Sequence, residues 1–292
     1  MRIGVLGANG GWHLGDLVRA AGEAHEIVPL AYTRLRSTVE PPGARVSSGE
    51  HDLDDLDAVI VRAMPPGSLE QVVFRMDALA QLEAAGVAVV NPAKTIEAAV
   101  DKYLATARLQ AAGLAVPRTA CCQTTDDALI AFRDLGGDAV VKPVFGAEGR
   151  GITRVTDEAV AERVFRALEQ VGSVLYLQEF IDHGGRDLRL LVIGDRVLGM
   201  QRANPGDWRT NASRGAVCTP LEVTAELAML AQQAAAAVGA TVAGVDLLPA
   251  ADGALFAIEV NACPGWQRLA RATGVDVAAL LLRHVASLAQ SE

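Results

Sequence analysis

Three side chains that offer oxygen atoms to a metal ion lie in two neighbouring apolar segments near the end of the chain. Glu259 and Asn261 occur two positions apart in "LFAIEVNACPGW", so on a β-strand they share one face. Asp246 belongs to the preceding segment "GVDLL", and Asp252-Gly253 between the segments predicts a hairpin turn that brings all three together. Two carboxylates and an amide oxygen suit magnesium or manganese better than zinc. A strand end with ordinary polar residues is the alternative, and for three residues on paired strands it is the weaker one.

A lysine followed by a glycine-rich run indicates a phosphate-binding loop. In "VVKPVFGAEGRGI", Lys142 ends an apolar strand, and Gly146, Gly149 and Gly151 follow it. The backbone amides of such a loop can approach phosphate closely. A P-loop would place its lysine after the last glycine, and a dinucleotide loop would lead into a helix, whereas "ITRVT" predicts a strand. The order favours a glycine-tipped hairpin that folds over phosphates, and for this motif alone a plain flexible hairpin is an equal alternative.

Several arginines and their polar neighbours crowd the sequence between the glycine loop and the predicted metal strands. They are Arg186, Asp187, Arg189, Arg209, Asn211 and Arg214. Guanidinium groups suit the recognition of carboxylate and phosphate. Each arginine alone is typical of a solvent-facing strand, but their concentration here favours anion binding.

Other catalytic patterns are weak. No Ser-His-Asp or Cys-His arrangement is visible, and none of the five histidines lies in a recognisable cluster. Cys263 follows the predicted metal strand, and we interpret it as a small packing residue. The N-terminal "GANGG" predicts a tight turn; as a dinucleotide loop it is poor, because the second strand ends in "PLAY" without an acidic residue for a ribose.

Composition narrows the class of protein. The formal charge of −9, from 26 basic and 35 acidic residues, argues against a nucleic-acid-binding surface, which needs a basic face. Residues 227–245 are uncharged, but their glutamines and alanines predict a helix that runs into a strand and no membrane segment. The four cysteines lack zinc-finger spacing, and "MRIGVLGANG" is no secretory signal. We therefore expect a cytoplasmic protein with reduced thiols.

The elements that position these residues fall into three regions. Strands and helices alternate in the first ninety or so residues, which predicts a parallel sheet with crossover helices. The second region begins with a helix over residues 96–112 and contains the glycine hairpin. The third contains two antiparallel hairpins with turns at Gly194-Asp195 and Asp252-Gly253. The fold class is thus α/β plus α+β.

Taken in order, these motifs resemble the ATP-grasp superfamily and, within it, the RimK-type α-L-glutamate ligases. The resemblance is carried by Lys102 of "VDKY", Lys142 with its glycine loop, "LQEFI", Asp187, "RTN", Asp246 and "EVN". It implies an N-terminal α/β domain at 1–95, a central lid at 96–180 and a C-terminal antiparallel domain at 181–292. ATP would lie between the last two.

The resemblance also implies roles for individual residues. Lys102 and Lys142 would contact ATP phosphates, together with the loop glycines. The adenine and ribose would meet the segment Gln178, Glu179, Phe180, Ile181 and Asp182. Asp187, Arg209, Thr210 and Asn211 would line the nucleotide site. Two Mg²⁺ or Mn²⁺ ions would bind Asp246, Glu259 and Asn261, and Arg214 would lie near the transferred phosphoryl group, sharing the catalytic role with Lys142.

The implied activity is ATP-dependent amide formation through an acyl phosphate. The segments "VRAMPPGSLEQVVFRMDALAQLEAAGVAVVNP" and "CPGWQRLARATGVDVA" look most like the ligases of tetrahydromethanopterin-linked one-carbon metabolism. The ribosomal-protein branch usually has serine in place of Cys263 and glycine in place of Ala216. We expect L-glutamate and a carboxylate-bearing coenzyme of the tetrahydromethanopterin or methanofuran type as substrates, and a homo-oligomer without nucleic-acid or membrane partners. The alternatives are a ligase for a protein or carrier-protein tail and a non-catalytic ATP-binding regulator.

Overall fold

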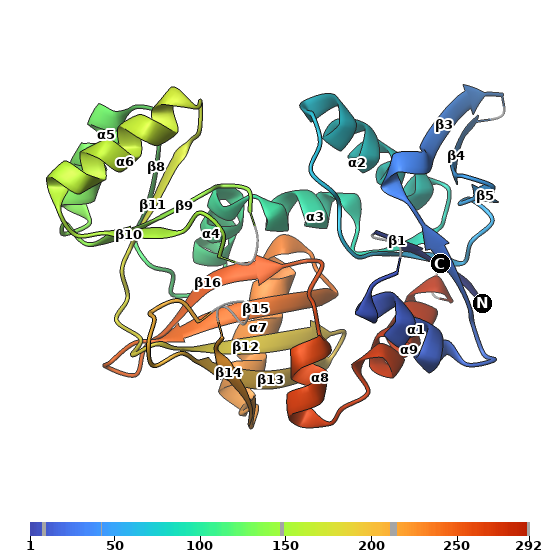
Figure 1. The fold of residues 1–292 in the computed structure, drawn as a ribbon. Helices are drawn as coiled ribbons and strands as arrows, with labels where there is room; N and C mark the ends of the chain where they lie inside the picture. The colour runs from blue at the N-terminus through green and yellow to red at the C-terminus, as the bar shows by residue number, and fades with distance from the viewer. Residues whose placement is uncertain (8–9, 42, 147–148, 211–214, 291–292) are drawn as a thin grey trace.

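The computed structural model describes residues 1–7, 10–41, 43–146, 149–210 and 215–290. Three main sheets and the helices that cover them form three parts of the molecule, with a smaller sheet at the edge of the first part (Figure 1). The order of these parts along the chain agrees with the α/β plus α+β class expected from the sequence.

The N-terminal part is built on a parallel sheet in the order β2-β1-β6-β7. Its strands are β1 (Arg2–Leu6), β2 (Glu26–Leu30), β6 (Ala58–Val61) and β7 (Ala88–Val90), with crossover helices α1 (Trp12–Ala21) and α2 (Leu69–Ala84). A short 3-10 helix, η1 (Tyr32–Arg34), leads into an antiparallel sheet that the sequence analysis did not predict. That sheet contains β3 (Leu35–Glu40), β4 (Gly43–Ser48) and β5 (His51–Asp52).

The central part has a sheet in the order β10-β9-β11-β8, with both of its own helices on one face. Its elements are β8 (Thr119–Cys122), α5 (Thr125–Asp134), β9 (Ala139–Lys142), β10 (Thr153–Val155), α6 (Glu158–Gln170) and β11 (Leu175–Glu179). Helices α3 (Ala93–Val100) and α4 (Lys102–Ala111) lead into it from the N-terminal part. The single helix predicted over 96–112 is therefore wrong, because Asp101 interrupts it and caps α4 through the Leu104 amide.

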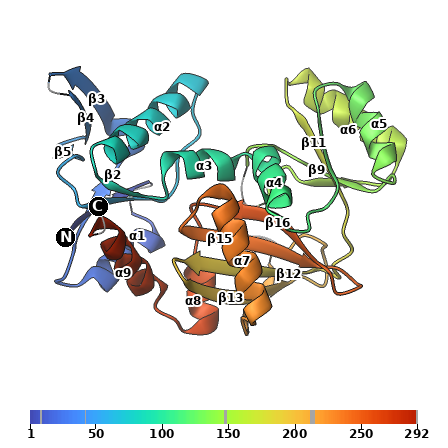
Figure 2. The ribbon, with the colours of Figure 1, turned by 180° about the vertical axis from the view of Figure 1, so that it is seen from behind.

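The C-terminal part is an antiparallel sheet in the order β14-β13-β12-β15-β16. Its strands are β12 (Arg186–Ile193), β13 (Arg196–Ala203), β14 (Val217–Leu221), β15 (Val242–Pro249) and β16 (Leu255–Asn261). Helix α7 (Ala225–Val238) covers one face of the sheet (Figure 2). The uncharged stretch 227–245 is thus a buried helix that runs into a strand, as predicted.

The last two helices return to the N-terminal sheet. Helix α8 (Gln267–Thr273) lies against β13 and β14, and α9 (Val277–Ala289) packs on α1, β6 and β7. Within the described residues no single helix is long and apolar enough to cross a membrane, although the bent pair of α8 and α9 has the necessary combined length and composition. The domain ranges 1–95, 96–180 and 181–292 stay a prediction.

One buried side chain fixes the N-terminal sheet to the C-terminal sheet. Asn91, which follows β7 and is 1% exposed, donates from Nδ2 to the carbonyls of Val242 and Ala262 at 2.6 Å each. Its Oδ1 accepts from the amides of Thr241 and Val242 at 3.0 and 3.2 Å. Every polar group of the amide is therefore used, and the ends of β15 and β16 are held beside the parallel sheet.

Candidate ATP and metal site

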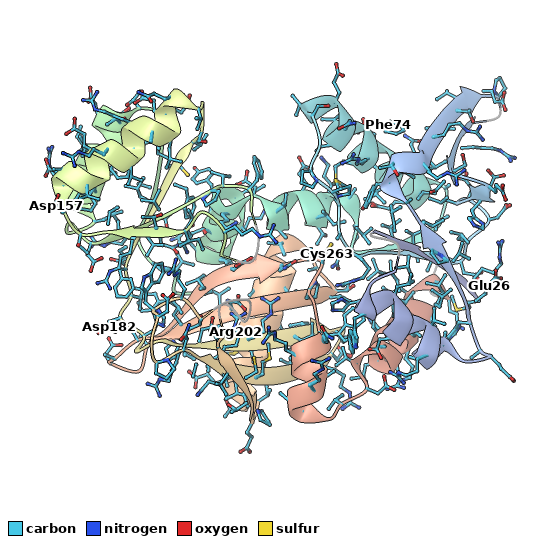
Figure 3. All side chains as sticks on the ribbon, viewed as in Figure 1. Glu26, Phe74, Asp157, Asp182, Arg202 and Cys263 are labelled. Carbon is cyan, nitrogen blue, oxygen red and sulfur yellow. The ribbon has the colours of Figure 1, made fainter. Side chains whose placement is uncertain are left out.

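The face of the C-terminal sheet opposite α7 is apolar at one end of its strands and charged at the other end. Leu188, Leu190 and Val192 of β12 point to α7 and join its core. Because side chains alternate along a strand, Asp187, Arg189 and Leu191 face the other way. At one end of that face, apolar residues pack against α8; at the other end, charged residues gather, and Arg202 is labelled there in Figure 3.

The strand register brings the three predicted oxygen donors onto this charged face. Asp246 of β15 lies directly opposite Glu259 of β16, and Gly244 lies opposite Asn261. Residues directly opposite each other in an antiparallel pair project to the same side. The hairpin expected from Asp252-Gly253 is confirmed, and so is the shared face of Glu259 and Asn261. A register shift between Asp246 and Leu247 places Asp246 on that face as well.

Two arginines and two aspartates form a buried ion-pair network on the same face. Arg189 Nη1 donates to Asp246 Oδ1 at 2.7 Å, and Arg202 Nη2 lies 2.9 Å from Asp246 Oδ2. Arg202 also binds both oxygens of Asp187, at 2.6 and 2.5 Å, and the Thr210 hydroxyl donates to the same carboxylate. None of the four charged side chains is more than 11% exposed. Two positive and two negative charges balance within the network.

This network sets the ionisation of its carboxyl groups. Burial by itself would raise the pKa of Asp246, but Arg189 and Arg202 outweigh it and hold the pKa below its usual value. At Asp187, burial raises the pKa in spite of Arg202 and Thr210. Burial opposes the charge of Arg202 too, yet Asp246 and Asp187 more than compensate and raise its pKa. Asp246 therefore stays ionised at neutral pH.

Gly244 makes the network possible. A Cβ atom at this position would lie 2.5 Å from Nη2 and 2.6 Å from Cζ of Arg189. The Arg189 guanidinium therefore occupies the space beside Gly244 of β15 while it bonds Asp246, two residues along the same strand. Any side chain at this strand position, opposite Asn261, would therefore displace the Arg189 guanidinium.

Two lysines share the pocket of Glu259, Lys142 from β9 and Lys102 from α4. Lys142 Nζ donates to Gln178 Oε1 at 2.5 Å, and Gln178 is itself held by the hydroxyls of Thr119 and Tyr176. Lys102 Nζ donates to the Gly146 carbonyl of the glycine loop at 2.7 Å. Burial lowers the pKa of Lys142 to about 8, with Glu259 opposing the shift, and burial lowers the pKa of Lys102 in the same way.

The Glu259 carboxylate is the least engaged of the three oxygen donors. Among the described residues, none makes a hydrogen bond or ion pair with it, whereas both oxygens of Asp246 contact arginines. Asn261 Oδ1 accepts one hydrogen bond, from the Cys263 amide at 2.8 Å. Carboxylate and amide oxygens carry two lone pairs each, so all three residues keep acceptor capacity. The donor set fits a hard divalent cation.

The metal site would not be made of acidic side chains alone. Within the described ranges, no group of three His, Cys, Asp or Glu side chains is placed to hold a metal ion. A cation at Asp246 and Glu259 therefore needs the amide oxygen of Asn261 or oxygens from a ligand. Magnesium commonly keeps such mixed coordination with substrate phosphates.

The segment expected to receive adenine and ribose follows β11. The Glu179 carboxylate is occupied by Arg118, which donates from its backbone amide at 2.8 Å and from Nε at 2.6 Å. Phe180 is packed between the Arg154 guanidinium, 3.4 Å from its ring centroid, and the edge of Trp208. A nucleotide would therefore meet the backbone of Glu179 rather than its side chain.

Most of the predicted residues line one pocket between the central and C-terminal sheets. They are Lys102, Lys142, Gln178, Glu179, Phe180, Ile181, Asp187, Arg209, Thr210, Asp246 and Glu259. Gly146, Gly149, Gly151 and Asn261 are not part of its lining, although β9 and β10 form the expected antiparallel hairpin and Lys102 contacts Gly146. Asn211 and Arg214 lie outside the described residues.

Three polar or aromatic residues that line this pocket were not among the predicted site residues: Arg202, Trp208 and His183. Only Arg202 had a usable signal. A turn at 194–195 pairs residue 202 with Asp187, so counting along that hairpin places the arginine beside the aspartate. Cys263 behaves as interpreted from the sequence, because burial raises the pKa of its thiol to about 11 and makes it a poor nucleophile at neutral pH.

Comparison with known proteins agrees with this geometry. Residues 99–285 match the RimK-like ATP-grasp domain. The chain is 34% identical to the tetrahydromethanopterin:alpha-L-glutamate ligase of Methanosarcina acetivorans over 89% of both chains, and 31% identical to the Methanococcus maripaludis enzyme of the same name over 99% of both. The solved ATP-grasp ligase PsnB in complex with a precursor variant, Mg and ADP superposes with a TM-score of 0.75 at 21% identity, covering 98% of each chain. This chain belongs to the RimK-like ATP-grasp family.

Proposed function

We propose that this protein is an ATP-dependent, ADP-forming ligase that joins a carboxylate to the amino group of L-glutamate. The acceptor carboxylate would belong to a coenzyme tail, of which tetrahydromethanopterin is the first candidate. Support for the substrates comes from the two methanogen relatives, which align with this chain along nearly its whole length.

The observation that carries the proposal is the convergence of two lysines on Glu259. Lys142 comes from β9 of the central part, Lys102 from the start of α4 and Glu259 from the C-terminal part, and one pocket contains all three. Phosphoryl transfer needs positioning and charge neutralisation more than a covalent group from the protein. The two lysines can position and neutralise a triphosphate, and the Glu259 carboxylate, which has no described hydrogen-bond partner, can bind its cation.

The residues divide the work between nucleotide and metal. Lys102, Lys142 and the glycine hairpin would hold the phosphates, and the backbone after β11 would hold the base. Asp246, Glu259 and Asn261 would hold one or two divalent ions, Mg²⁺ or Mn²⁺. The metal would neutralise phosphate charge and polarise the phosphoryl oxygens.

The reaction would proceed in two transfers. A carboxylate oxygen of the acceptor attacks the terminal phosphorus of ATP, and the bond to ADP breaks. The amine of glutamate then attacks the acyl carbon, phosphate leaves, and the amine gives up a proton. Arg214 is assigned to the neighbourhood of the transferred phosphoryl group from its place in the sequence.

Coupled ADP release tests this proposal. Purified protein with Mg²⁺, ATP, tetrahydromethanopterin and L-glutamate should release ADP only when both substrates are present, and mass spectrometry should find the acceptor heavier by one or more glutamate residues. ADP release with a peptide or carrier-protein tail alone would favour the protein-modifying alternative. Nucleotide binding without release under any pairing would favour a regulatory protein and contradict the proposal.

A further inference from the structure

A second group of polar side chains lies at the carboxyl edge of the N-terminal sheet, next to the end of β16. Arg62 follows β6 and Tyr32 follows β2, so both side chains start from the same edge of the parallel sheet. Cys263 follows β16, packs with the Tyr32 cluster, and is labelled in Figure 3 where the C-terminal sheet meets the N-terminal part. Ligands of open α/β sheets commonly bind at this edge.

The Arg62 guanidinium has one of its two edges unused. Its Nη1 donates to the Pro264 carbonyl at 2.7 Å, and its plane stacks on the Trp266 ring with Cζ 4.5 Å from the centroid. Nε is buried and has no hydrogen-bond partner among the described residues, and no carboxylate there pairs with the guanidinium. A buried donor without a partner costs stability, so its presence needs a reason.

The surroundings keep this arginine oriented. The Trp266 backbone amide donates to His13 Nε2 at 3.2 Å, and its ring Nε1 donates to Asp16 at 2.8 Å, so the backbone and the ring of Trp266 are each held by one hydrogen bond. The Tyr32 hydroxyl is a second buried polar group that lacks a partner within the described chain. The contact with Trp266 therefore holds the Arg62 guanidinium in place and leaves its Nε without a hydrogen-bond acceptor.

The position ties this arginine to the proposed reaction. Asn261 accepts from the Cys263 amide, and Arg62 donates to the carbonyl of the very next residue, Pro264. The turn after the proposed metal strand therefore links the cation site directly to the guanidinium.

We infer that the free Nε–Nη2 edge of Arg62 binds a carboxylate of the amino-acid or acceptor substrate, with Tyr32 as a supporting hydroxyl. The inference rests on the proposed function and names the binding site of one of its two substrates. Arginine offers two parallel donors to a carboxylate, a geometry that lysine cannot reproduce. Arg62 acts here as a specificity-determining residue outside the nucleotide pocket.

Substitution of Arg62 tests this site in the full-length protein. Arg62→Met should raise the KM of one carboxylate substrate roughly 10- to 100-fold, because charge-assisted hydrogen bonds are lost. Arg62→Lys should recover only part of this loss, and Tyr32→Phe should have a smaller effect of the same sign. Arg2→Met is the matched control, since it removes the same charge from the opposite edge of the same sheet.

The pattern of KM values identifies which substrate is bound. A rise for L-glutamate alone assigns the amino acid to Arg62, and a rise for tetrahydromethanopterin alone assigns the acceptor. The KM of ATP should not change. Unchanged KM values for both carboxylate substrates overturn the inference, as does an equal effect of Arg2→Met.

A binding readout separates this inference from the ligase activity itself. Thermal unfolding with L-glutamate or tetrahydromethanopterin, in the absence of ATP, should raise the Tm of the wild type but not of Arg62→Met. This result would support the site even if no ADP were formed. Equal shifts in the two proteins, including no shift in either, overturn it.

Discussion

Replacing Gly244 with alanine tests the buried network most directly. The added methyl group would lie 2.5 Å from Arg189 Nη2, whereas ordinary contacts of this kind are about 3.5–4.0 Å. Arg189 therefore has to move by about 1 Å, which is enough to break its 2.7 Å hydrogen bond with Asp246. Overpacking of this size costs about 1–3 kcal/mol, and weakening a buried ion pair adds to it. Since Asp246 keeps Arg202 as a partner, we expect a total loss of about 2–4 kcal/mol.

A double-mutant cycle with Arg189→Ala isolates the cause. The single Arg189→Ala change also destabilises, because Asp246 loses one of its two arginines. In that background the guanidinium that the methyl group would meet is absent, so Gly244→Ala should cost nothing or stabilise by up to about 1 kcal/mol. We expect a coupling free energy of about 2 kcal/mol or more between the two sites, measured by urea unfolding. Effects that add within about 0.5 kcal/mol would refute the steric account of the glycine.

Three further predictions concern the pocket and the link between the sheets. Glu259→Gln should leave the free energy of unfolding within about 1 kcal/mol of the wild type, because no described residue pairs with the carboxylate, yet reduce ADP release by roughly two orders of magnitude or more; undiminished turnover would contradict the metal assignment. Lys142→Met should weaken ATP binding, as measured by calorimetry, and wild-type affinity should fall as the pH rises above about 8, where this lysine loses its proton, whereas the variant should lack this pH dependence. The folded pKa of Lys142 lies below its usual 10.5, so burying the charged lysine costs stability below pH 8. Between pH 8 and 10.5 the folded protein loses this proton and the cost disappears. The stability of the wild type relative to Lys142→Met should therefore rise across that window by up to about 3 kcal/mol. Asn91→Ala should lower the free energy of unfolding by about 3–5 kcal/mol through four lost hydrogen bonds, against about 0.5 kcal/mol or less for the exposed control Lys94→Ala; a small effect at residue 91 would show that the two sheets are held by other contacts.

The hairpins that carry the site were predictable because local signals specify them. The turns at 194–195 and at 252–253 lie between alternating or apolar segments, and each determines its own register to within a residue. The shared face of Glu259 and Asn261 followed from their spacing of two residues, whereas Asp246 joins that face because the register shifts between Asp246 and Leu247, a feature that the turn does not encode. The glycine hairpin of β9 and β10 followed in the same way from the strand-forming residues on both sides of the loop.

What could not be predicted depends on contacts between elements far apart in the chain. The pairing of β12 with β15, which places Arg189 beside Asp246, joins strands separated by a hairpin and a helix, and no local pattern encodes it. The β3–β5 sheet was missed because β3 and β5 are largely exposed, and in β4 the buried residues Ser47 and Ser48 are polar, which leaves Val46 as its member of the apolar core cluster. Asp101 could have been recognised as a helix cap, since an aspartate before a helical segment is a typical start signal.

The charges in the pocket divide into a fixed group and a free group, and this division explains which residues respond to ligand. Asp187, Arg202, Asp246 and Arg189 neutralise one another, so removing any one of them leaves a buried charge behind and damages the fold. The charges of Lys102, Lys142 and Glu259 are not neutralised by ion pairs in this way. The two lysines donate to uncharged oxygens, and the Glu259 carboxylate has no hydrogen-bond or ion-pair partner among the described residues. A triphosphate with its cation supplies the opposite charges that these three lack. Substitution of Glu259 is therefore a clearer test of metal binding than substitution of Asp246, because loss of Asp246 would lower both metal binding and the stability of the fold.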